Sequence, residues 1–486
     1  MPDIIVKTPA GALLGHVQDG VRHWLGVPYA QAQRFAAPEP VAPWEGVRSA
    51  LEMAPQCPQS MGPQARTEEP DFAEDCLALN IYVPEGGADV GAKPVFVWIH
   101  GGAFLAGGSN GYDGGELACS GDMVVVTINY RVGVLGFVNF GDVLGLPDIP
   151  SNLGLRDQIA ALEWVRDNIA AFGGDPQRVT IAGQSAGSMS VSLLLLSRQT
   201  WPLYRGAIMQ SGAVSLIHDR EHSQRVARRY AELLDLNQGD LDKLRQIDVA
   251  TLLEVQTRIG KEERNSIPAA PWYDGDLLPG SLEEAHAHPT PAIPLIAGSA
   301  REEIRLFDLM PGDILPSSWD DLEALLHSSL PKEQAEAVLA AYPRTRQGRR
   351  ALATDLTFAM PTRNYAERHA RQHPTWYYRF DYAHPIAGAT HGLELLLFWP
   401  FSGLRALLAR GGRMKGRRAA LGARMNRHWA HFTHHGRPGD DWPAYTPEQR
   451  QVRLFNLEDA LVTNLDAERL AAWNGRDVGP GISQQG

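Results

Sequence analysis

Short apolar runs rich in β-branched residues alternate with helical patterns in the first half of the chain. Three of these runs are bounded by Gly or Pro: residues 95–99, 124–130 and 179–182. Runs of this kind are typical of strands buried on both faces. Between the last two, apolar residues recur at helical spacing over 155–169, and the pattern stops at Gly173. Strand, helix and strand in this order predict a mostly parallel sheet covered by helices.

The second half of the chain carries further strand patterns separated by long helical segments. The predicted strands are residues 207–210, 293–297 and 375–382. Residues 219–290 and 305–370 have helical patterns, and we expect them to be insertions at the sheet edge, where substrate pockets are commonly built. No linker separates them, so the sequence predicts one α/β domain over residues 1–486.

Composition and charge exclude several classes of protein. The net charge of -11 argues against a nucleic-acid partner. No apolar stretch approaches the roughly 20 residues that span a bilayer, and the N-terminus lacks a secretory signal pattern, so we expect a cytoplasmic protein without membrane association. The three cysteines lack the spacing of a zinc site. We therefore expect no metal site.

A pentapeptide of the nucleophile-elbow type lies at Gly183-Gln184-Ser185-Ala186-Gly187. An apolar run precedes it, and Met189, Val191 and residues 193–196 predict a buried helix after it. Strand, sharp turn and helix is the context in which such a serine is exposed as a nucleophile. The pentapeptide also occurs by accident, but this context favours a catalytic Ser185 over a plain Gly-Ser loop.

A second glycine-rich segment, His100-Gly101-Gly102-Ala103-Phe104, follows the predicted strand 95–99. Adjacent glycines allow backbone N–H groups to turn towards a ligand, as in the HGG loops of lipases and esterases. Acyl transfer needs such donors for the developing oxyanion. The segment predicts an oxyanion hole, with a plain glycine turn as the alternative.

With these motifs the chain resembles the type-B carboxylesterases, the group that includes cholinesterases and bacterial p-nitrobenzyl esterases. The resemblance extends over nearly the whole chain, on residues 172–187, 74–80, 127–137, 152–158, 429–432, 436 and 442–445. It implies an α/β-hydrolase fold, hydrolysis of carboxylic esters through an acyl-serine intermediate, and no cofactor or metal.

The resemblance also implies the other two members of a catalytic triad. The residues alone do not choose between Glu302 and Glu303 after the predicted strand 293–297, but the family pattern selects Glu303. Of the 16 histidines, His391 in Gly388-Ala-Thr-His-Gly-Leu-Glu394 resembles the catalytic histidine, with His384 as the alternative. In this assignment Ser185 attacks, His391 transfers the proton and Glu303 orients the imidazole.

Further roles come from the resemblance alone. It implies that the N–H groups of Gly102, Ala103 and Ala186 form the oxyanion hole. Ser211 corresponds to a hydroxyl placed behind the triad in the family, or else serves an ordinary turn. Cys57 and Cys76 resemble a disulfide pair of the family, although a reducing cytosol would oppose that bond.

The expected substrates are uncharged esters with small to medium acyl groups. Many relatives carry Glu before the nucleophile, whereas Gln184 is neutral, and residues 57–76 contain no Trp to stack on a choline head. The alternatives are amidase, thioesterase, carbamate or polyester hydrolysis on the same triad, and a non-catalytic cholinesterase-like interaction protein. The only small-molecule partner expected is the ester.

Two weaker signals stay open. Residues 405–437 contain nine Arg or Lys and no acid. They predict either a site for an anionic partner or, as favoured here, solvated arginines that face acidic neighbours. Five aromatic residues near the motif loops either line an apolar gorge or belong to the core: Phe104, Tyr112, Phe307, Phe398 and Trp399.

Overall fold

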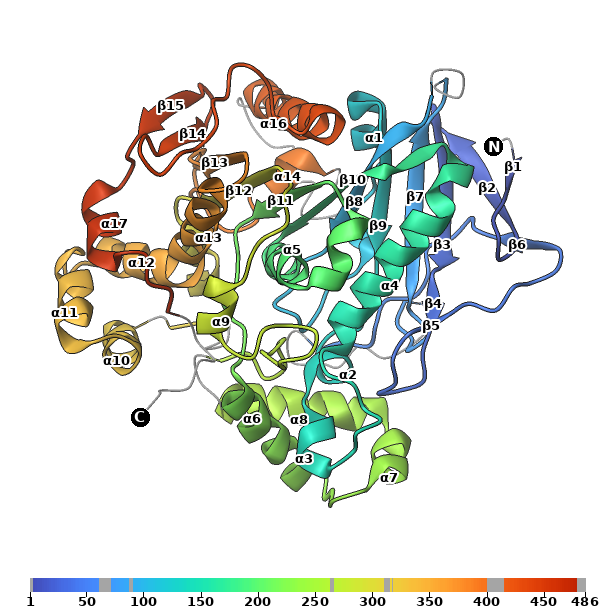
Figure 1. Cartoon of the computed structure of the whole chain (residues 1–486), viewed down its shortest axis with the longest axis horizontal. Coiled ribbons are helices and arrows are strands. Elements are labelled where there is room, and N and C mark those ends of the chain that lie inside the picture. Colours follow the sequence, from blue (N-terminus) through green and yellow to red (C-terminus); the bar gives the residue numbers. More distant parts are fainter. Residues whose placement is uncertain are drawn as a thin grey trace.

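A sheet of 13 strands runs through the described part of the molecule (Figure 1). The structure is a computed structural model that describes residues 3–60, 71–86, 91–262, 266–309, 315–316, 318–399 and 415–478. The central strands are mutually parallel, in the spatial order β9 (Val124–Ile128), β8 (Lys93–Ile99), β10 (Gly174–Gln184), β11 (Gly206–Gln210), β12 (Leu295–Ala300), β13 (Thr375–Phe380) and β14 (Gln451–Phe455).

Antiparallel strands extend this centre at both edges. On the β9 side they are β7 (Ala78–Pro84), β3 (Val21–Pro28), β2 (Ala12–Gln18) and β1 (Asp3–Lys7), and β6 (Val47–Ser49) also pairs with β2. On the other side β15 (Ala460–Thr463) pairs with β14. A separate small ribbon joins β4 (Ala30–Gln31) and β5 (Glu39–Pro40). The predicted mostly parallel sheet is confirmed, within a mixed sheet.

Several strand boundaries differ from those predicted. β9 ends at Ile128 and not at 130, because the backbone N–H of Asn129 turns to Ala78 O and its side chain accepts from Ser109 N. β10 begins at Gly174, earlier in the chain than the predicted start at 179, because Gly174 pairs with Lys93 ahead of a register shift. β12 runs over Leu295–Ala300 and β13 ends at Phe380.

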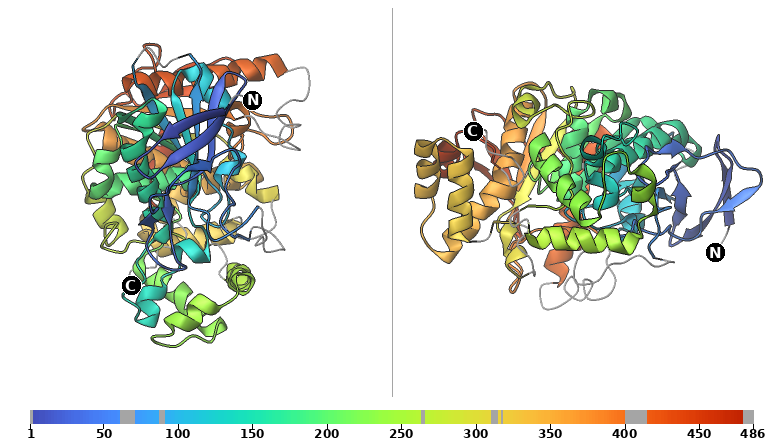
Figure 2. Two further views of the ribbon diagram at one scale, coloured as in Figure 1. Left: turned by 90° about the vertical axis from the view of Figure 1, so that its right-hand side faces the viewer. Right: turned by 90° about the horizontal axis from the view of Figure 1, so that it is seen from below.

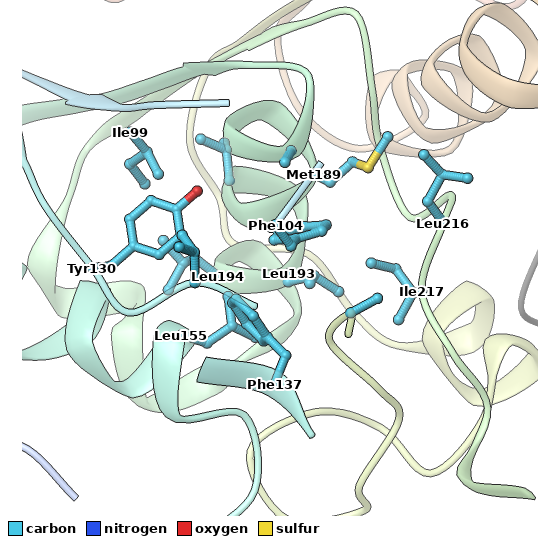
Figure 3. Packing of buried hydrophobic residues seen from close by; sticks show 14 of the residues in the cluster. Ile99, Phe104, Tyr130, Phe137, Leu155, Met189, Leu193, Leu194, Leu216 and Ile217 are labelled. Atoms are coloured by element: carbon cyan, nitrogen blue, oxygen red, sulfur yellow. The ribbon is translucent and has the colours of Figure 1, made fainter. Parts of the chain in front are cut away.

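Helices cover both faces of the sheet. On one face lie α4 (Leu153–Asn168), α5 (Ala186–Leu196) and α13 (Met360–Ala370), and on the other lie α1 (Gly115–Gly121) and α16 (Lys415–His435) (Figure 1). Successive side chains of β8 divide between the two cores. Val95, Val97 and Ile99 join the first, whereas Phe96 and Trp98 join the second. Figure 3 shows part of the first core around α5, to which Phe104, Phe137 and Leu193 belong.

The long segments between the late strands are helical, as predicted. The first contains α6 (Arg220–Leu233), α7 (Leu241–Gln246), α8 (Val249–Glu262) and α9 (Leu282–Ala287), and the second contains α10 (Trp319–Ser329), α11 (Lys332–Ala340), α12 (Arg346–Thr354) and α13. Helix α6 packs against the short α3 (Phe140–Leu144) and against α8, and this helical group projects from the body of the molecule (Figure 2). The remaining short helices are α2 (Val134–Phe137), α14 (Leu395–Phe398) and α17 (Ala467–Trp473).

A buried ion pair ties α4 to the segment that follows β9. Arg131 Nη2 lies 2.7 Å from Asp157 Oδ1, and Arg131 Nε donates to Asp157 Oδ2 over 2.8 Å. Asp157 is fully buried. Breaking such a pair on one side leaves an uncompensated charge in the interior, so it is a strong constraint on this junction.

Three described arginines of the basic segment, Arg417, Arg424 and Arg437, face acidic neighbours. Arg424 bonds both oxygens of Asp459 at 2.9 and 3.1 Å, and Arg417 lies 3.3 Å from Glu458. This agrees with the favoured interpretation of residues 405–437, of which 405–414 lie outside the described residues. None of the helices in the described ranges is long and apolar enough to cross a membrane.

Candidate active site

Ser185 occupies a strained turn between β10 and α5. Its φ and ψ are 60° and -127°, a conformation that L-residues rarely adopt. The turn closes tightly, since a Cβ on Gly183 would lie 2.4 Å from the Gly187 backbone, and one on Gly187 would lie 2.0 Å from Ile99 O. The backbone N–H of Ser185 donates to Gln210 O over 2.9 Å. The glycines of the pentapeptide are therefore required by packing, and they hold Ser185 partly exposed at the sheet edge.

The HGG segment packs directly against this turn. A Cβ on Gly101 would lie 3.0 Å from Ser185 Cβ and 2.6 Å from Gln184 O, so only glycine fits there. Gly102 and Ala103 both have positive φ, 125° and 56°. Within the described residues neither of their N–H groups donates a hydrogen bond. The N–H of Ala186, at the first position of α5, has no partner inside the helix.

His100 holds the HGG segment in place as a neutral imidazole. Its ring is buried and stacks on Tyr130 with centroids 4.2 Å apart. Burial lowers the pKa of His100 to about 4, although the contact with the Gly101 carbonyl opposes this. In the neutral ring, Nδ1–H donates to Gly101 O over 2.9 Å. This hydrogen bond holds the peptide group between Gly101 and Gly102.

Glu303 and His391 form a buried pair at the carboxyl ends of the central strands. His391 Nδ1 lies 2.6 Å from Glu303 Oε2, and the other carboxylate oxygen accepts from Ala300 N, also over 2.6 Å. Glu303 follows β12, and His391 lies in the loop after β13. Since the carboxyl ends of parallel strands meet at one edge, these two residues come together with Ser185 and the HGG segment, which follow β10 and β8.

The second imidazole nitrogen faces Gln184 and not Ser185. Gln184 Nε2 lies 3.1 Å from His391 Nε2, and both side chains are buried. Among the described residues no hydrogen bond joins Ser185 Oγ to His391. Catalytic hydrogen bonds are often long or unformed without substrate, so this arrangement is compatible with a nucleophile at rest.

Two phenylalanines pack against the imidazole. The ring centroid of Phe358 lies 4.5 Å from that of His391, and the centroid of Phe307 lies 5.3 Å away. Phe358 belongs to a single π-helical turn, Asp355–Ala359, between α12 and α13. Such turns are rare and are frequent at functional sites. Phe307 was among the predicted gorge candidates, whereas nothing in the sequence distinguished Phe358.

Ser211 and Glu394 lie behind the triad residues. Ser211 follows β11, is fully buried and has a φ of 58°. Burial and the negative charge of Glu303 raise the pKa of Glu394 to about 8, while contact with the Ser211 hydroxyl opposes the shift. Ser211 thus lies near a buried carboxyl group, and its role behind the triad stays a prediction.

The alternative site residues lie in other surroundings. Glu302 is half-buried and accepts from Ala389 N over 3.0 Å and from Arg305. His384 Nδ1 faces the amides of Ile386 and Ala387, each 3.3 Å away, in a turn. Of the two glutamates and two histidines, only Glu303 and His391 contact each other.

The other gorge candidates belong to the core. Phe104 is fully buried and packs on Phe137 with centroids 5.2 Å apart. Tyr112, Phe398 and Trp399 gather around Trp98 in the second core. This packing favours the core alternative for these four residues.

Cys57 and Cys76 are buried free thiols in the structure, and the disulfide that the resemblance implies is not formed. The Cys57 sulfur instead accepts from Val132 N over 3.5 Å. No group of three or more His, Cys, Asp or Glu in the described ranges is arranged to hold a metal ion.

The sheet, the nucleophile elbow and the loops at its carboxyl edge define an α/β-hydrolase fold. The family model "Carboxylesterase family" matches residues 2–473, and the chain belongs to that family. It is a serine carboxylic ester hydrolase.

Known relatives match over almost the whole chain. The chain is 36% identical to a para-nitrobenzyl esterase of Bacillus subtilis (strain 168), which covers 96% of this chain and 97% of that protein, and 32% identical to a human cocaine esterase, which covers 96% and 90%. A solved structure of a thermophilic p-nitrobenzyl esterase superimposes with a TM-score of 0.87 at 35% identity, over 96% of this chain and 99% of that one. A carboxylesterase of Geobacillus stearothermophilus gives 0.84 at 33% identity, with the same coverage.

Proposed function

We propose that the chain hydrolyses uncharged carboxylic esters of small to medium acyl length, with Ser185 as nucleophile, His391 as base and Glu303 as the acid that orients it. The observation that carries the assignment is the buried His391–Glu303 pair, 2.6 Å long, at the sheet edge where the strained Ser185 turn lies. The proposed unit is one domain over residues 1–486, because the sheet is continuous from β1 to β15.

The first half-reaction transfers the acyl group to the enzyme. Ser185 Oγ attacks the carbonyl carbon as His391 Nε2 takes the hydroxyl proton. The carbonyl oxygen becomes an oxyanion, and in this proposal the N–H groups of Gly102, Ala103 and Ala186 stabilise it. His391 returns the proton to the alcohol oxygen as the ester C–O bond breaks.

The second half-reaction repeats these steps with water. His391 removes a proton from a water molecule, which attacks the acyl carbon, and Ser185 leaves with the proton. Throughout, Glu303 keeps Nδ1 protonated and stabilises the imidazolium. No metal or cofactor takes part in this proposal, and the cytoplasmic location likewise stays a prediction.

The preference for uncharged esters rests on Gln184, whose neutral amide stands beside the base. Relative kcat/KM on matched esters, thioesters and amides separates this function from the other acyl-transfer activities.

Covalent labelling tests the nucleophile. An organophosphate should label Ser185, and Ser185→Ala should lower kcat/KM on p-nitrophenyl acetate by several orders of magnitude in a folded protein. Ser192→Ala is the matched control, since Ser192 is a buried serine of α5, the helix that follows Ser185, and its hydroxyl donates to Met189 O. Label on another serine, or substantial turnover by Ser185→Ala, would contradict the assignment.

A further inference from the structure

Gln184 directly precedes the nucleophile, yet its side chain contacts the base. Its Nε2 atom lies 3.1 Å from Nε2 of His391, which stands 207 positions later in the chain. Gln184 is only 4% exposed and His391 only 7%, so water competes little for this contact. Because both groups are buried, loss of either partner would leave the other without its hydrogen bond at the centre of the site.

The hydrogen on each nitrogen follows from the contacts. Glu303 is a carboxylate acceptor 2.6 Å from His391 Nδ1, so Nδ1 carries the hydrogen. A neutral imidazole then has a lone pair on Nε2. The amide nitrogen of Gln184 has only hydrogens to offer, and it therefore donates to that lone pair. This is the lone pair that must accept the proton of Ser185.

We propose that Gln184 is a positioning residue: in the resting enzyme its amide donates to the lone pair of His391, favours the neutral imidazole, and gives way to the Ser185 hydroxyl when the nucleophile is activated. The inference rests on the proposed function, because it requires Ser185 and His391 to be nucleophile and base. It accounts for the missing Ser185–His391 hydrogen bond among the described residues.

The charged groups around the imidazole do not replace this effect. Glu303 contacts Nδ1, and Glu394 lies behind it, in contact with Ser211. Asp308 and Asp355, on the segments that carry the two phenylalanines, are paired with Arg349, Arg350 and Arg469. Gln184 is thus the group that faces Nε2, and its chemistry determines which protonation state of that nitrogen is favoured.

An acceptor in place of the amide should reverse the preference. A carboxylate at position 184 cannot donate to the neutral ring but accepts from an imidazolium N–H, so Gln184→Glu favours the charged ring. Gln184→Met keeps an unbranched side chain of similar length without a hydrogen to donate. In the wild type, accepting from an imidazolium would require the amide to turn over and present its oxygen.

The experiment is a titration of His391 in three proteins. In 15N-histidine-labelled enzyme, the His391 signals are identified by their loss in His391→Gln, and their titration midpoint is compared in wild type, Gln184→Met and Gln184→Glu. We expect the midpoint to rise by about half to one pH unit in Gln184→Met, the equivalent of one hydrogen bond, and by more in Gln184→Glu. The acid limb of kcat/KM should move in the same order.

Controls separate this effect from a general structural change. Gln158→Met removes a buried amide that donates to Ser190 Oγ over 3.1 Å, away from His391, and should leave the midpoint in place. In the wild type, the nitrogen shifts should show the Nδ1–H tautomer, and the Nε2–H tautomer would overturn the proposal without any variant.

Coincident midpoints in all three proteins, or a lower midpoint in Gln184→Glu, would equally overturn the proposal. Organophosphate labelling distinguishes this failure from that of the proposed function. Label on Ser185 with unmoved midpoints rejects the role of Gln184 alone, whereas label elsewhere rejects the nucleophile itself.

Discussion

The buried carboxyl groups of Glu303 and Glu394 interact, and the charge on Glu303 helps to keep Glu394 protonated. Burial is the larger cause, and together they raise the pKa of Glu394 to about 8 from 4.5. Both oxygens of Glu303 have partners, Ala300 N and the imidazole of His391. The surroundings of Glu394 therefore favour its neutral form.

Glu394→Gln should weaken the loss of stability that accompanies a rise in pH from about 4.5 to 8. Between about pH 4.5 and 8 the unfolded chain loses the Glu394 proton while the folded protein keeps it, so the free energy of unfolding falls as pH rises, by on the order of a few kcal/mol. An amide mimics the neutral acid and has no proton to lose. Denaturation midpoints at pH 5 and pH 9 should thus differ less in the variant.

Glu302→Gln is the control for this comparison, since Glu302 is half-buried and paired with Arg305. If the wild type and Glu394→Gln show parallel pH dependence, Glu394 does not carry the proton that its burial requires.

The ion pair between Arg131 and Asp157 predicts a second stability effect. Asp157→Asn leaves the Arg131 guanidinium buried without a countercharge and should lower the free energy of unfolding by about 3 to 5 kcal/mol. Asp167→Asn, on the same helix, breaks an exposed pair with Arg166 and should cost at most about 1 kcal/mol. Urea denaturation of the two variants measures the difference, and equal losses would contradict the argument.

The choice of base is tested by two histidine variants. His391→Gln should lower kcat/KM by several orders of magnitude, because the nucleophile loses its proton acceptor. His384→Gln should change it only a few-fold, since His384 serves a turn. Turnover of p-nitrophenyl acetate by both folded variants decides the matter, and the reverse pattern would move the base to His384.

Local sequence predicted those parts of the structure that local physics determines. The elbow glycines and the HGG pair are readable because contacts of 2.0–3.0 Å with neighbouring backbone or Ser185 Cβ forbid a Cβ at Gly183, Gly187 and Gly101. Burial of β8 on both faces could be predicted because residues 95–99 include no polar residue. The start of β10 did not, because pairing of Gly174 with Lys93 overrides the turn signal of Gly173-Gly174.

Long-range packing set what the sequence left open. The choice of His391 came from a motif likeness, since periodicity does not rank 16 histidines. Phe358 reaches the imidazole through a π-helical turn that its residues do not announce. The contact of Gln184 with His391 joins distant parts of the chain, and only the folded sheet brings them together. The order β9-β8-β10 likewise places β8 between the two strands that flank α4.

Uncharged esters should be hydrolysed better than choline esters of the same acyl group. A neutral amide, Gln184, lies next to His391 where many relatives carry a carboxylate, and residues 57–76 contain no Trp for a trimethylammonium head. A lost cation–π contact is worth roughly 2 kcal/mol when desolvated, which is close to thirtyfold in kcat/KM.

The comparison is between acetylcholine and its uncharged analogue 3,3-dimethylbutyl acetate, because the two substrates have nearly the same shape and differ in charge. Low ionic strength is the stringent condition, since the field of the -11 net charge then attracts the cation most. The analogue should still be preferred. Gln184→Glu restores a negative charge beside the base and should narrow the difference. If the wild type hydrolyses acetylcholine tenfold faster or more, an aromatic or acidic group elsewhere forms a cation site, and the preference argued from Gln184 is wrong.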